Sequence, residues 1–190
     1  MRLGFAAWLM GDFILRQTAI IAGVGITPFG KHLDRSLSSL AREAIEQALA
    51  DAGVGLESIQ AAWSGNAGGS VITGQVCIAG QVVLRHMGCG GIPVINVENA
   101  CATASTAFQQ ACTMVTLGAY DVVLAFGMEK LYHEVKERSM AVYAGCVDTE
   151  RPESLDHYLV GDLSPAQIEA APQDRRSLFM DIYARMARDY

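Results

Sequence analysis

The sequence predicts an α/β fold with a mostly parallel sheet and helices on both of its faces. Four short apolar segments rich in β-branched residues alternate with three segments in which apolar residues recur every three or four positions. The first pattern is typical of buried strands and the second of amphipathic helices. Strands that alternate with helices along a chain form parallel sheets through right-handed crossovers. The 51% hydrophobic content of the 190 residues suits a fold of this kind.

The predicted elements follow one another in the order strand, helix, strand, helix, strand, helix, strand. The expected strands are Thr18–Gly25, Ile59–Ser64, Pro93–Val97 and Asp121–Phe126, and the expected helices are Leu37–Ala52, Gln75–Met87 and Cys101–Leu117. Ser36 before the first helix is a good N-cap and Gly53 a good stop. The third helix is small or apolar on nearly every side. We therefore expect it to be the most buried helix, between two layers.

The two ends of the chain differ from this α/β core, which we place at residues 18–130. Residues 1–17 are expected to be an extension outside the core, because the apolar run Leu3–Met10 is too short to span a membrane. Residues 131–190 carry many charges and three prolines. We expect them to leave the core as an irregular excursion and to end in a helix over Ser177–Tyr190.

Composition excludes several classes of function. The net charge is −6 and no cluster of Lys and Arg is present, which argues against a general nucleic-acid binder. No apolar run reaches the length of a membrane span. The five cysteines show no spacing typical of a zinc site, so we expect reduced thiols, no metal, and a cytoplasmic protein.

Cys101 is the candidate reactive group. It follows the apolar run Val94–Val97 and the pair Glu98–Asn99, and it opens the third predicted helix. Backbone N–H groups at a helix start favour a thiolate over a thiol. A cysteine at this position can be a nucleophile, but it can also be a small core residue.

Three segments carry a resemblance to a known family. The run Asn96–Ala107, with Cys101 inside it, resembles the nucleophile segment of thiolases, and is closest to sterol-carrier-protein-type thiolases and acetyl-CoA acetyltransferases. Gly127-Met128-Glu129-Lys130 is similar to the turn that follows in that branch, and Ala19–Gly30 resembles the opening strand and loop. The resemblance implies a thiolase-like layered fold of which this chain holds only the first half, truncated within residues 131–190. A Gly-His-Pro motif, which carries the activating histidine in the family's second half, is absent from this sequence.

The resemblance also implies roles for individual residues. Cys101 would attack an acyl thioester and carry the acyl group. Asn99 and Ala102 would support the turn and an oxyanion hole, although Asn99 can equally be a plain helix cap. Glu129 would lie at the active-site rim, or else be a salt-bridged carboxylate at a strand end. The other cysteines and the histidines lack the family's motif context. We expect Cys77 and Cys112 to lie in the core, and Cys89 and Cys146 to lie in loops. His133 and His157 are expected to be exposed to solvent.

The function that follows from the resemblance is that of the N-terminal portion of an acyl-CoA acyltransferase, similar to acetyl-CoA acetyltransferases of lipid and fatty acid metabolism. A coenzyme A thioester would be the substrate, with no covalently bound cofactor. Partners would be a second copy, paired near Pro93–Val97, or a chain that supplies the second half. Two alternatives stay open: a non-catalytic thiolase-fold fragment or partner subunit, and a thiolase-fold aldolase or condensing enzyme. Independent turnover by this chain is likewise left open.

Overall fold

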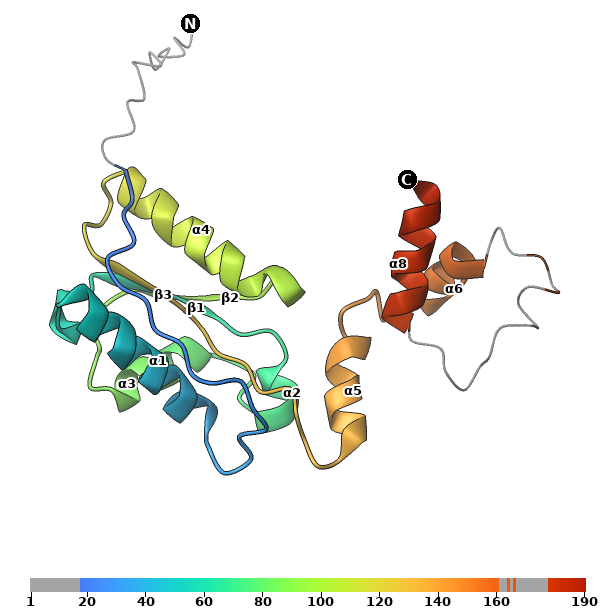
Figure 1. Cartoon of the computed structure of the whole chain (residues 1–190), viewed down its shortest axis with the longest axis horizontal. Coiled ribbons are helices and arrows are strands. Elements are labelled where there is room, and N and C mark those ends of the chain that lie inside the picture. Colours follow the sequence, from blue (N-terminus) through green and yellow to red (C-terminus); the bar gives the residue numbers. More distant parts are fainter. Residues whose placement is uncertain (1–17, 161–163, 165, 167–177) are drawn as a thin grey trace, which may run out of the picture. The chain divides into compact units, whose positions relative to one another are not determined.

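The computed structural model describes residues 18–160, 164, 166 and 178–190 (Figure 1). They belong to two compact units, of which the first ends at Val142 and the second begins at Tyr143. The expectation for residues 1–17 lies outside the described residues. Within the described residues, no helix is long and apolar enough to cross a membrane.

A parallel sheet of three strands forms the centre of the first unit. The strands are β1 (Ala61–Gly65), β2 (Val94–Val97) and β3 (Val123–Gly127). Their order in the sheet is β2-β1-β3, and Ala62 of the central strand pairs with Val94 on one side and Leu124 on the other. The prediction of an α/β fold with a parallel sheet is confirmed, and three of the four predicted strands are present.

Helices cover both faces of this sheet, as predicted (Figure 1). Helices α1 (Leu37–Ala52) and α3 (Ala79–His86) lie on one face, and α4 (Thr103–Thr116) lies on the other. Because side chains alternate along a strand, Ala62 faces α1 and α3 while Ala61 and Trp63 face α4. The chain therefore builds two separate hydrophobic clusters, one on each side of the sheet.

Helix α1 has the predicted bounds, and its two ends are closed by local bonds. The hydroxyl of Ser36 accepts a hydrogen bond from the Ser39 N–H at 3.0 Å, which satisfies one of the free donors of the first turn. Gly53 ends the helix with φ 68°, and its N–H donates to the Ala50 carbonyl at 3.2 Å.

The predicted first strand, Thr18–Gly25, is wrong. This segment is extended but belongs to no sheet, and its apolar side chains are exposed, with Ile20 at 85%. Its backbone turns to helix α1 instead. The Val24 N–H donates to the Asp51 carboxylate at 2.9 Å and the Ile26 N–H to Gln47 Oε1 at 3.1 Å.

Two glycines explain why this segment lies flat against α1. A Cβ added to Gly25 would lie 2.1 Å from the Ala44 carbonyl oxygen, and one added to Gly23 would lie 2.3 Å from that of Ala48. A residue with a side chain could not approach the helix backbone this closely. The apolar pattern correctly predicts that the backbone is extended, but it does not predict which groups accept the hydrogen bonds of its N–H groups.

The expectation that the third helix would be the most buried is also wrong. Helix α4 buries only Thr103, Ala107 and Ala111, while Phe108 on its outer side is 45% exposed. A single sheet layer covers one side of the helix. Its opening turn is a 3-10 turn, η2 (Ala100–Ala102), and not α-helix.

The segment between β1 and α3 differs from prediction as well. A short helix, α2 (Gly69–Thr73), precedes a loop, and α3 begins at Ala79 and not at Gln75. Gly74 and Ile78 both have positive φ, which interrupts a continuous helix. A further 3-10 turn, η1 (Leu56–Ser58), leads into β1.

The region after Lys130 is more regular than expected. It contains α5 (Lys136–Ala144), α6 (Pro152–Val160) and α8 (Leu178–Asp189). The last of these confirms the predicted C-terminal helix, and the two others lie where irregular chain was expected. The expectation for residues 161–163, 165 and 167–177 lies outside the described residues. Within the second unit, the Tyr158 hydroxyl of α6 donates to the Asp189 carboxylate of α8 at 3.2 Å.

Candidate active-site turn

Cys101 lies in the middle of η2, between the end of β2 and the start of α4, and its side chain is exposed. This is the carboxyl edge of a parallel sheet, where α/β folds place their ligands. The residue before it, Ala100, has φ 43°, an unusual conformation for a residue with a side chain. The Glu98 carboxylate accepts the Ala100 N–H at 2.6 Å and so holds this turn.

The structure places Asn99 and Ala102 inside the same turn. The Asn99 N–H donates to Thr103 Oγ1 at 2.8 Å, and the Ala102 N–H donates to the Asn99 carbonyl at 2.9 Å. Both N–H groups are thus engaged in shaping the turn. Asn99 stands at the cap position, but its side chain does not cap the turn and instead donates to Thr106 Oγ1 at 2.9 Å.

Thr103 is a residue of the site that sequence reasoning missed. Its side chain is buried, its hydroxyl donates to the Ala100 carbonyl at 2.7 Å, and the same oxygen accepts the Asn99 N–H. A single hydroxyl therefore locks the turn on both sides of Ala100. The signal in the sequence was a threonine two residues after Cys101, at the helix start, where Thr commonly bonds to nearby backbone.

Glycines at the strand ends let α4 begin directly above the sheet. Gly65 of β1 and Gly127 of β3 are register partners. A Cβ on Gly65 would lie 2.9 Å from Thr103 Cγ2, and one on Gly127 would lie 3.4 Å from Ala104 Cβ. The absence of a side chain at Gly65 therefore lets Thr103, at the start of α4, lie this close to the sheet, whereas an added Cβ at Gly127 would make only an ordinary contact.

Glu129 follows β3 at the same edge, and the described structure shows a hydrogen-bonded carboxylate there instead of the salt bridge considered above. Its Oε2 accepts the N–H groups of Ala67 at 3.0 Å and Gly68 at 2.9 Å. These belong to the turn Asn66–Gly69 that follows β1. Glu129 thereby joins the ends of two neighbouring strands.

The remaining cysteines form no disulfide in the described structure and lie apart from this turn in the chain. Cys112 is half-buried in α4, whereas Cys77 is exposed in the loop before α3, which contradicts the expected core position. Cys89 is half-buried and Cys146 is exposed. In the described part of the chain, no group of three His, Cys, Asp or Glu could hold a metal ion.

None of the histidine rings that the structure describes bonds to the turn around Cys101. His32 Nε2 lies 2.7 Å from the Pro28 carbonyl. His133 is half-buried, contrary to expectation, and its Nδ1 accepts the Val135 N–H at 2.9 Å. His86 ends α3 and is exposed, and the side chain of His157 lies outside the described residues.

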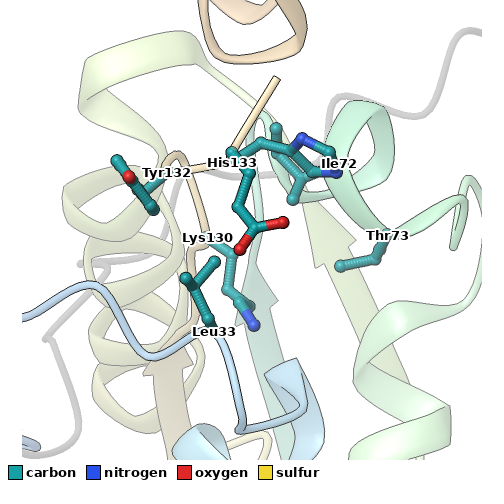
Figure 2. Close-up of a pocket in the computed structure, with 7 residues that line it drawn as sticks. Leu33, Ile72, Thr73, Lys130, Tyr132 and His133 are labelled. Carbon is teal, nitrogen blue, oxygen red and sulfur yellow. The ribbon is translucent and has the colours of Figure 1, made fainter. Parts of the chain in front are cut away.

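A cavity of about 320 Å³ lies beyond the end of β3 and does not include Cys101. In the view of Figure 2, Tyr132 and Thr73 lie on opposite sides of it, with Lys130 and Leu33 between them. The lining residues are Leu33, Ile72, Thr73, Lys130, Tyr132, His133 and Glu134. The Lys130 ammonium donates to the Arg35 carbonyl at 2.5 Å, so this lysine also ties the segment after β3 to the loop before α1.

Comparison with known proteins identifies the family. The model of the family described as "Thiolase, N-terminal domain" matches residues 19–174. Sterol carrier protein 2 of Gallus gallus is 38% identical over 120 residues, which cover 62% of this chain and 21% of that protein. An acetyl-CoA acetyltransferase of Methanocaldococcus jannaschii is 41% identical over 117 residues, which cover 62% of this chain and 29% of that protein.

Solved structures include a 3-oxoacyl-[acyl-carrier-protein] synthase III of Aquifex aeolicus, with a TM-score of 0.48 and 17% identity, over 57% of this chain and 34% of that one. The chain thus spans between a fifth and a third of the length of the relatives it matches. Because the thiolase model covers most of the sequence, including β1, β2, β3 and the turn with Cys101, the chain belongs to the thiolase family and carries its N-terminal domain.

Proposed function

We propose that this chain is the N-terminal portion of an acyl-CoA acyltransferase in which Cys101 accepts the acyl group. The observation that carries the proposal is the position of Cys101, exposed on a turn at the carboxyl edge of the sheet and at the start of α4. The relatives named acetyl-CoA acetyltransferase favour an acetyl thioester as the first substrate to test.

In the proposed step, the Cys101 sulfur attacks the thioester carbonyl carbon. A new carbon–sulfur bond forms to Cys101, the bond to the coenzyme A sulfur breaks, and that sulfur leaves with its electron pair and a proton. The Cys101 proton passes to a base during the attack. The positive end of the α4 dipole next to Cys101 favours the negative charge that develops at the sulfur.

A second candidate function follows from the surroundings of Cys101. In the described residues no histidine ring bonds to the turn around Cys101, so a histidine that takes the Cys101 proton would have to come from outside this turn. Phe108, in the second turn of α4, is 45% exposed and also offers an apolar side chain on the same helix as the turn. The chain would then act as a partner subunit that presents Cys101 to a site completed by another polypeptide.

We extend the proposal to a homodimer in a reducing compartment such as the cytoplasm. The strand order β2-β1-β3 leaves the outer edge of β2 without a neighbouring strand among the described residues, and an open edge favours pairing with a second copy. None of the five cysteines, all of which the structure describes, forms a disulfide, which fits a compartment that keeps thiols reduced.

The test is acylation of the full chain, followed by intact mass. Incubation with acetyl-CoA should add one acetyl group to the wild type, and Cys101→Ser should remove that adduct. Cys112→Ser is the matched control, since Cys112 lies in α4, the helix that follows the turn with Cys101, and is half-buried. An adduct that persists in Cys101→Ser contradicts the role of this residue, whereas no adduct on the wild type rejects independent acylation and favours the partner-subunit function.

A further inference from the structure

Glu129 collects four N–H donors at the carboxyl end of β3. Its Oε2 accepts the backbone N–H groups of Ala67 and Gly68, as described above. Its Oε1 accepts the Lys130 N–H at 3.2 Å and the Asn66 side-chain amide at 3.4 Å. Bonds to an ionised acceptor are stronger than those between neutral groups, so this carboxylate fixes the turn that follows β1.

The turn held by Glu129 is bonded to all three strand ends. The Asn66 N–H donates to the Val97 carbonyl of β2 at 3.3 Å, and the Asn66 side-chain amide donates to the Met128 carbonyl after β3 at 2.7 Å. The Met128 N–H in turn donates to the Gly65 carbonyl of β1 at 3.0 Å. A shift of the turn would therefore move the ends of the strands on which α4 rests.

The contact chain continues from the strand ends to Cys101. Gly65 lies directly below the methyl group of Thr103, where even one added carbon would be 2.9 Å away. Thr103 bonds to the backbone of Asn99 and Ala100, which precede Cys101. Each link from the Glu129 carboxylate to the turn at Cys101 is a hydrogen bond or a van der Waals contact.

We propose that Glu129 is a positioning residue for Cys101, acting through the turn after β1 and through Thr103. This inference rests on the proposed function, in which Cys101 is the acyl acceptor. Loss of the carboxylate releases the turn Asn66–Gly69, and the turn Asn99–Ala102 then samples conformations in which the sulfur is no longer held at the start of the α4 dipole. Cys101 reactivity falls as a result, while the helix itself stays folded.

The test uses the full chain with Glu129→Gln, Glu129→Ala and the control Glu137→Gln, an exposed acid of α5. Glu129→Gln keeps the size of the side chain but offers one acceptor oxygen and an amide donor in place of two acceptor oxygens. Two properties are measured: hydrogen exchange of peptides covering 65–69 and 98–104, and the alkylation rate of Cys101 by iodoacetamide relative to Cys112. Cys112 reports any general opening of α4, because it is half-buried in that helix and reacts faster when the helix opens.

We expect exchange in both peptides to rise roughly tenfold in Glu129→Ala and less in Glu129→Gln, as the bonds to a charged acceptor are lost. The Cys101 rate should fall roughly threefold while the Cys112 rate stays the same, as the dipole at the helix start is no longer aligned with the sulfur. Faster exchange in 65–69 alone, with an unchanged cysteine ratio, would overturn the proposal. If Glu129→Ala unfolds, Glu129→Gln decides by the same two measurements. Neither measurement uses acyl transfer. If the wild type accepts no acetyl group, the proposed function is rejected, but hydrogen exchange and alkylation still test whether Glu129 positions Cys101.

Discussion

The two faces of the sheet are packed in different ways. On the face covered by α1 and α3, large apolar side chains such as Ile45 and Leu84 are 1% exposed. On the face covered by α4, the fully buried apolar residues of the helix are small, Ala107 and Ala111, and they pack against Trp63 of the central strand, with Met114 partly buried beside them. One face is held by large interlocking side chains, and the other by close approach of a helix to the sheet.

Because of this difference, the face that contributes most to stability is not the face that carries the candidate site. Helix α4 carries the turn with Cys101, and its start lies close to Gly65, where an added Cβ would be 2.9 Å from Thr103 Cγ2. The α1 and α3 face buries larger side chains and so contributes more of the hydrophobic free energy. The first two predictions below test this difference between the two faces: one removes side-chain volume from the α1 and α3 face, and the other adds volume to the α4 face.

The largest effect is expected from truncation on the α1 and α3 face. Ile45→Ala should lower the free energy of unfolding by about 2–5 kcal/mol, because Ile45 is fully buried and the helix cannot close the cavity. Urea denaturation followed by circular dichroism measures the change. Arg42→Ala on the exposed side of α1 is the control and should cost no more than about 1 kcal/mol, because its ion pair with Glu46 is exposed. Equal losses in both variants would show that this face is not the main source of stability.

The α4 face should respond to added volume. Ala107→Leu should lower the free energy of unfolding by about 1–3 kcal/mol, since Ala107 is 1% exposed and packs directly on the sheet. Gln109→Leu, on the exposed side of α4, should change the free energy of unfolding by no more than about 0.5 kcal/mol. Thermal and urea denaturation compare the two variants. A stabilised Ala107→Leu would mean that this contact is loosely packed, and would remove the contrast between the faces.

The elements around the candidate site were predictable from sequence because their signals are local. Ser36 and Gly53 mark α1 by capping, and the apolar run at Val94–Val97 followed by small residues marks β2 and α4. Thr18–Gly25 shows the limit of this approach. Its apolar pattern is that of a strand, but two glycines and the acceptors on α1 give its backbone partners outside the sheet.

The position of Cys101 was also predictable, but the bonds that shape its turn were not. A strand that ends before a small-residue helix places the cysteine at the sheet edge. The clamp by Glu129 joins residues more than 60 positions apart, and the lock by Thr103 depends on the unusual backbone of Ala100. Long-range hydrogen bonds and a positive φ have no signature in hydrophobic periodicity.

The smallest effect is expected from a buried hydroxyl on the α3 side of the sheet. Ser64 is 1% exposed, and its Oγ is the one buried side-chain polar atom in the described structure that has no hydrogen-bond partner. Its side chain instead fills the space left by Gly80, whose added Cβ would lie 2.8 Å from that oxygen. Ser64→Ala removes an unpaired polar atom, so the free energy of unfolding should stay the same or rise by about 1 kcal/mol.

Thr103→Val is the matched contrast on the α4 face. Its hydroxyl is buried too, but it bonds to Asn99 and Ala100, and the change leaves the Asn99 N–H without its acceptor. We expect a loss of about 1–3 kcal/mol from Thr103→Val, opposite in sign to the effect of Ser64→Ala. Parallel urea denaturation curves measure both. If both variants lose similar stability, then Ser64 makes a polar interaction in solution and the two hydroxyls do not differ. If the signs are opposite, the buried hydroxyl of Thr103 stabilises the turn at Cys101 by its hydrogen bonds, while the hydroxyl of Ser64 only fills the space beside Gly80.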